Sequence, residues 1–161
     1  MNGQGRRWPA PVRVLAEAAE DAVAAARARE PEPYEAAVTR LVALNPEHVG
    51  LVLGAVVRML LEELHPDGLA GEDVQAVLER CARGALPWFP GLDPAVLVVL
   101  LTGALGVHEP AEEAERPAEP AVVRHAPLLV ADLLAAVGRP LSGYLEVALT
   151  EIQRTELMEL P

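Results

Sequence analysis

The residues best suited to chemistry gather near the end of one apolar stretch, residues 46–64. Glu62 and His65 form a Glu-x-x-His pair, which puts a carboxylate and an imidazole on one face of a helix, as in ferritin-like diiron bundles. Such a centre needs two of these pairs, and no other histidine in the chain has a glutamate three residues before it. We therefore interpret the pair as a solvated helix end, and predict no metal and no cofactor.

Arg58 is the only charged residue between positions 49 and 61, so its guanidinium needs either water or an anionic partner. Glu62, one helical turn away, is the nearest candidate. Asp132, another isolated charge in an apolar stretch, is a second candidate. In a third interpretation Arg58 clamps an anionic ligand. That interpretation makes Arg58, Glu62 and His65 a candidate binding stripe.

The tripeptide His65-Pro66-Asp67 resembles the motif that J-domain co-chaperones carry between their second and third helices. The resemblance implies contact with a chaperone ATPase through basic residues of the helix before the motif. In this chain Glu62 and Glu63 stand just before it, separated from it by Leu64. We therefore interpret the segment as an ordinary proline turn between two helices.

The inventory of nucleophiles is small, because the chain has no lysine, one serine and one cysteine. Cys81 lies on the apolar stripe of its helix and is predicted to be a buried, inert thiol. Ser142 fits a helix cap better than a catalytic hydroxyl, since no Gly-x-Ser-x-Gly pattern surrounds it. The composition itself is typical of a high-GC bacterial genome. These residues favour a protein that is not an enzyme.

The formal net charge of −11 is spread without any long basic segment, and aromatic residues make up 3% of the chain. Nucleic-acid binding needs cations and stacking rings, so we exclude that class. The longest apolar stretch, 95–107, has 13 residues, short of the roughly 20 that span a bilayer. We expect a cytoplasmic protein without a membrane span.

Apolar residues at helical spacing predict an all-α fold, a single compact bundle of six to seven helices within one domain, 1–161. Two helices, near 46–64 and 94–106, are expected to be buried at its centre. Residues 1–11 are predicted to be a frayed terminus, and 108–120 an acidic disordered linker rich in Pro, Glu and Ala. The remaining helices are expected near 12–29, 33–44, 72–85, 128–137 and 141–157.

Two further features bear on binding. Trp88 and Phe89 share one proline-bounded loop, where they either fold back onto the core, which we favour, or form an exposed anchor for a partner. Gly50 and Gly54, like the glycine pair near 103–106, allow another helix to approach closely. This approach is expected to be packing within the chain, or a dimer seam if the face is exposed.

The sequence thus favours a non-enzymatic helical protein-interaction or adaptor module, which binds a protein partner or associates with itself. The alternative is a sensory domain that binds a small apolar ligand and has no DNA-binding unit. The candidate binding residues are Arg58, Glu62, His65, Trp88 and Phe89.

Overall fold

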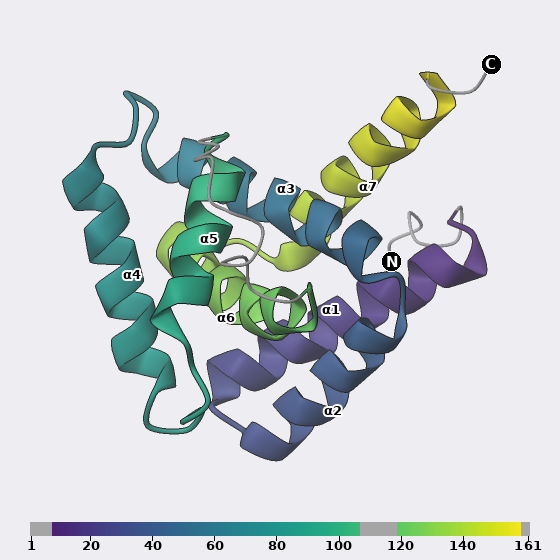
Figure 1. Ribbon diagram of the computed structural model, residues 1–161. Coiled ribbons are helices and arrows are strands. Elements are labelled where there is room, and N and C mark those ends of the chain that lie inside the picture. The colour runs from purple at the N-terminus through teal and green to yellow at the C-terminus, as the bar shows by residue number, and fades with distance from the viewer. Residues whose placement is uncertain (1–7, 107–118, 159–161) are drawn as a thin grey trace.

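The computed structural model describes residues 8–106 and 119–158, which form seven α-helices and no strand. The predicted all-α fold and compact bundle are confirmed (Figure 1). The helices are α1 (Ala10–Ala28), α2 (Pro31–Ala43), α3 (Pro46–Leu64), α4 (Gly71–Ala85), α5 (Pro94–Ala104), α6 (Glu119–Val137) and α7 (Leu141–Met158).

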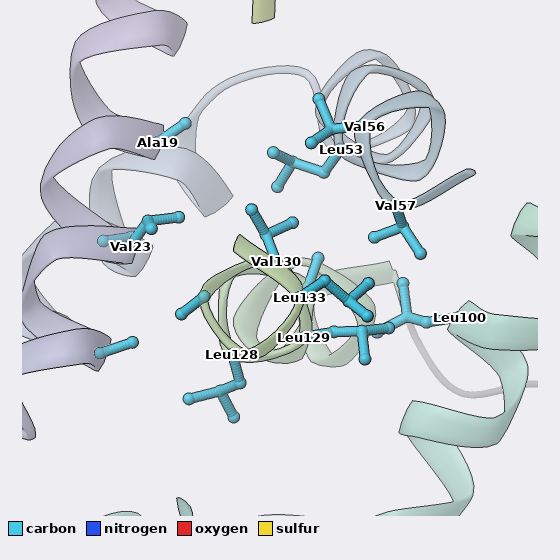
Figure 2. Packing of buried hydrophobic residues seen from close by; sticks show 14 of the residues in the cluster. Ala19, Val23, Leu53, Val56, Val57, Leu100, Leu128, Leu129, Val130 and Leu133 are labelled. Carbon is cyan, nitrogen blue, oxygen red and sulfur yellow. The ribbon is translucent and has the colours of Figure 1, made fainter. Parts of the chain in front are cut away.

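The centre of the bundle is formed by α3 and α6. Helix α6 contacts α1, α2, α3, α4 and α5, and Figure 2 shows its side chains, among them Val130 and Leu133, between α1, α3 and α5. The prediction of a central helix over 46–64 is therefore confirmed. The prediction of a second one near 94–106 is wrong, because α5 leaves Val98 and Val99 about 40% exposed. Helix α6 takes that place.

The bounds of α3 are set by local chemistry at each end. The Asn45 side chain accepts hydrogen bonds from the backbone N–H groups of Glu47 and His48, and Pro46 has the fixed φ that suits a first turn. At the other end the backbone turns through residues 65–68, where Gly68 has a φ of 105° that favours glycine. The predicted proline turn between two helices is present.

Helix α6 begins earlier than predicted. Its first residues, Glu119 and Pro120, belonged to the predicted 108–120 linker, while 108–118 lie outside the described residues. Pro127 lies inside the helix and cannot donate a backbone hydrogen bond to Val123. The helix continues through this defect because apolar contacts on several sides hold it.

The stretch Pro120–Val137 has the length and mean hydropathy, 1.5, of a membrane-crossing helix. In this bundle 56% of that stretch is buried, which is what the core helix of a helical bundle shows. Helices α2 and α3 pass the same test only as a pair bent by 119°. The expectation of no membrane span considered the longest apolar stretch, 95–107. It did not consider α6, because Arg124 and Asp132 interrupt the apolar sequence of that helix.

The first two helices form an antiparallel hairpin. Ala10 and Pro11 already belong to α1, so the predicted frayed segment 1–11 is wrong at those two residues, and 1–7 lie outside the described part. Arg29 ends α1 in the left-handed conformation, with a φ of 58°. The alanine-rich face of α1 is buried against α2 and α6 of the same chain.

Candidate functional site

A groove of about 670 Å³ runs along α3 between α5 and α7. Small and apolar residues make up most of it, and three glycines from two helices, Gly50, Gly54 and Gly103, form part of its surface. We call it the glycine groove. Its lining residues are Glu47, Gly50, Leu51, Gly54, Ala55, Arg58, Val99, Leu100, Gly103, Ala104, Leu105, Gly106, Val122, Glu151, Ile152 and Thr155.

The glycines of this groove face open space. A Cβ atom added at Gly50, Gly54 or Gly103 would meet no heavy atom within 4 Å. The close helix approach that the Gly-x-x-x-Gly spacing predicted is therefore not made by another helix among the described residues. No side chain or backbone of residues 8–106 and 119–158 covers these glycines within that distance.

Large apolar side chains stand at the edges of the groove. Leu51 of α3 is 57% exposed and Val99 of α5 is 41% exposed, and both line the groove. Single exposed apolar residues are common on protein surfaces. Here they lie beside an apolar hollow, and contiguous exposed apolar surface of this kind marks interaction sites.

Arg58 lies in the wall of the glycine groove, and its ion-pair partner was not predicted. Its Nη2 lies 3.2 Å from Oε1 of Glu151 in α7, so the predicted pairings with Glu62 and with Asp132 are both wrong. The two side chains are 42% and 50% exposed, which makes the pair weak. The Nε atom of Arg58 is buried and has no hydrogen-bond partner among the described residues.

Asp132 is instead held by α4. Arg80 donates to both carboxylate oxygens, from Nε at 3.1 Å to each and from Nη2 at 2.7 Å to Oδ2. The Asp132 side chain is only 16% exposed. This bidentate bridge explains how a carboxylate is accommodated on the central helix.

The other members of the predicted stripe do not converge with Arg58. Glu62 is exposed and makes no hydrogen bond or ion pair within the described ranges. His65 caps the end of α3, and its Nδ1 lies 4.0 Å from Oδ2 of Asp73. No group of three or more metal-ligating side chains occurs in residues 8–106 and 119–158.

Trp88 and Phe89 fold back onto the core, as predicted. Both rings contact Tyr34 edge-on, with ring centroids 5.2 and 5.5 Å apart, and Tyr34 is fully buried. The Tyr34 hydroxyl donates a hydrogen bond to the backbone carbonyl of Arg124 in α6. The aromatic contacts thus hold the loop against α2 and α6. Neither Trp88 nor Phe89 lines the glycine groove that contains Arg58.

Trp88 and Phe89 also line a second hollow, of about 640 Å³. Nearby, the buried His125 accepts a hydrogen bond from the Asp93 backbone and donates one to the carbonyl of Ala121. Burial lowers the pKa of His125 below its ordinary value. We call this the aromatic hollow; it is lined by Pro31, Glu32, Glu35, Trp88, Phe89, Pro90, Gly91, Asp93, Val96, Ala121, Arg124 and His125.

Of the two side chains considered as nucleophiles, Cys81 is buried and Ser142 is exposed. Cys81 is buried, as predicted, and burial raises the pKa of its thiol to about 12, so at neutral pH the thiolate is absent. Ser142 is exposed near the start of α7.

Comparison with known proteins gives no relative. No protein-family model, no curated protein and no solved structure matches this chain. Sequence reasoning had noted the glycines of the groove but expected them to be covered, and it did not identify Leu51, Val99 or Glu151. The sequence around these three residues gives little indication that they line a groove. Whether a residue on an apolar helix is exposed depends on where the other helices lie.

Proposed function

We propose that this protein is a helical protein-interaction module that binds one amphipathic helix of a partner protein in the glycine groove. The observation that carries the proposal is the open glycine surface on α3 and α5. Gly50, Gly54 and Gly103 have no neighbour within 4 Å of an added Cβ. Glycines on a helix face let another helix backbone approach closely, and the exposed Leu51 and Val99 would pack against its apolar face.

Charge favours a cationic helix over a second copy of this chain. The charged side chains of the groove are Glu47, Arg58 and Glu151, and Arg58 is already paired with Glu151. Glu47 makes no ion pair within the described residues. Two chains that each carry a net charge of −11 repel one another. A partner helix with arginine or lysine beside its apolar face would instead be attracted.

The proposal is tested with two labelled synthetic helices of about 18 residues, or five turns. Both have the same leucine and alanine face, flanked by arginine in one peptide and by glutamate in the other. Fluorescence anisotropy with the full chain is expected to give saturable binding of the cationic peptide, at least tenfold tighter than that of the anionic one. Gly54→Leu, which fills the groove, is expected to weaken binding at least tenfold.

The matched control is Gly143→Leu, the same substitution at an exposed glycine of α7 that does not line the groove. It is expected to leave peptide binding unchanged. Equal binding of both peptides, or equal binding by Gly54→Leu and Gly143→Leu, would contradict the proposal. Sedimentation showing a dimer that Gly54→Leu dissociates would make a second copy the occupant and overturn the choice of partner.

A second candidate function is binding of a small apolar ligand with an anionic group in the same groove. It is favoured by the volume of about 670 Å³, which falls in the range of small-molecule sites, and by Arg58, whose Nε lacks a partner. The probe is an anilinonaphthalene sulfonate dye. Enhanced dye fluorescence that Arg58→Met removes would support this function, and fluorescence unchanged by Arg58→Met would exclude it for this groove.

A further inference from the structure

We propose that the aromatic hollow binds a quaternary ammonium group of a small molecule. This inference is independent of the helix-binding groove, because the two hollows share no lining residue. It rests on three properties of the aromatic hollow: fixed aromatic rings, an excess of carboxylates, and non-polar surface between the charges.

The rings are held in place before any ligand arrives. Trp88 and Phe89 are half-buried and lie 5.9 Å apart between centroids. Each also contacts the fully buried Tyr34 edge-on, and Phe89 contacts His125 in the same way at 5.7 Å. Edge contacts of this kind fix ring orientation. A cation is attracted to aromatic faces, most strongly to tryptophan.

The charges around the rings favour a cation. Glu32, Glu35 and Asp93 line the hollow, and among the described residues Arg124 is the only lining group with a permanent positive charge. The Arg124 guanidinium is paired with Glu35, so its charge is largely compensated. Asp93 caps α5 by accepting from the backbone N–H of Ala95 at 3.0 Å. Glu32 is exposed and makes no ion pair within the described residues.

His125 adds no positive charge to this hollow. Its Nε2 accepts the backbone N–H of Asp93 at 2.9 Å, which requires a neutral ring. The sum of the lining charges is therefore negative at neutral pH, and an anionic ligand would be repelled.

The walls between the charges favour a methylated cation over a primary ammonium. Pro31, Pro90 and Val96 contribute non-polar surface. A primary ammonium has three N–H donors, which hold water or carboxylates and oppose close contact with apolar surface. A trimethylammonium group has none, and its methyl groups can contact both rings and prolines. The hollow, at about 640 Å³, has ample room for such a group.

The test is an NMR titration of the isotope-labelled full chain with choline chloride, against sodium chloride at equal ionic strength. The indole N–H resonances of Trp88 and Trp8 are followed. Choline is expected to shift the Trp88 resonance saturably and to leave that of Trp8 unchanged, since Trp8 does not line the hollow. Its neutral isostere, 3,3-dimethylbutanol, is expected to bind at least tenfold more weakly.

Two substitutions, each of which removes one negative charge, test whether the carboxylate in the hollow attracts the ligand. Glu32→Gln is expected to weaken choline binding at least threefold, whereas Asp67→Asn, the same loss of charge in the exposed α3–α4 turn, is expected to leave it unchanged. Equal binding of choline and the neutral alcohol would reduce the site to an apolar hollow and overturn the proposal. A Trp88 resonance that does not move with choline, or moves without saturating, would overturn it as well.

Discussion

The backbone N–H of Asp93 donates a hydrogen bond to Nε2 of His125 at 2.9 Å, while Nδ1 of the same ring lies 2.8 Å from the carbonyl of Ala121. This pairing fixes the imidazole as neutral, with its proton on Nδ1. It joins the residue that caps α5 to the central helix α6, and so secures the loop that carries Trp88 and Phe89. Protonation of the ring would remove the acceptor and break the first of these bonds.

Stability is expected to fall in mildly acidic solution because of His125. Burial is the main reason that its pKa is lowered, and the Arg124 guanidinium adds to the effect. The unfolded chain, with a histidine pKa of about 6.5, therefore binds more protons than the folded chain as the pH falls through that value. Urea unfolding is expected to give a free energy of unfolding that decreases below about pH 6.5, and levels off below the folded pKa.

Two variants isolate this effect from other titrations. His125→Leu is expected to flatten the decrease between about pH 7.5 and 5.5, whereas His65→Gln, at the partly exposed end of α3, keeps it. A pH dependence identical in His125→Leu and the natural chain would contradict the assignment.

The bridge between Arg80 and Asp132 is expected to contribute more than an exposed ion pair. Asp132 is 16% exposed and accepts two-pronged hydrogen bonds from Arg80, so Asp132→Ala is expected to cost about 1–2 kcal/mol. The pair of Arg40 and Asp21 has side chains 48% and 61% exposed. Asp21→Ala is expected to cost less than about 0.5 kcal/mol. Chemical denaturation measures both, and equal costs would refute the distinction.

The buried hydroxyl of Tyr34 is expected to stabilise the junction of α2 and α6. Tyr34→Phe removes its hydrogen bond to the carbonyl of Arg124 and is expected to lower the free energy of unfolding by about 1 kcal/mol. Burial raises the pKa of this hydroxyl well above its ordinary value, so it stays protonated up to strongly alkaline pH. Tyr144→Phe, at a largely solvated hydroxyl bonded to Glu63, is the control and is expected to change stability by less than about 0.5 kcal/mol.

Alanine in the glycine groove is expected to stabilise the protein. Gly54 lies inside α3, and an added Cβ meets nothing within 4 Å. Gly54→Ala therefore gains helix propensity without a clash and is expected to raise the free energy of unfolding by about 0.5–1 kcal/mol. Gly68→Ala is the contrasting variant, since its φ of 105° opposes any side chain, and it is expected to destabilise. Thermal unfolding distinguishes the two, and a destabilised Gly54→Ala would show that the groove surface is already covered.

Local signals in the sequence predicted the helices well. The start of α3 follows from Asn45 and Pro46, and its end from the turn at 65–68, because capping and turn chemistry depend on neighbours in the chain. The same logic placed a helix start near 128, whereas α6 begins at Glu119. The helix passes through Pro127 because tertiary packing on α6 offsets one lost backbone hydrogen bond.

Relationships between distant residues were not predictable from the sequence. Arg58 was matched with Glu62 because they are one turn apart, yet its partner Glu151 lies 93 residues away. The apolar composition of α5 predicted a central helix, although one side of it is exposed. Of the candidate residues, the inward folding of Trp88 and Phe89 was predicted correctly, since large rings gain most from burial.

The central position of α6 has a consequence for how the chain is made. The helix that contacts α1, α2, α3, α4 and α5 is sixth in chain order, so a ribosome synthesises more than one hundred residues before it. The apolar faces of α1 and α3, including Val23 and Val56 (Figure 2), emerge without the surface that covers them. Assembly of the core must therefore wait until α6 has been synthesised, and the nascent chain passes through a period in which those faces are open to chaperones or to aggregation.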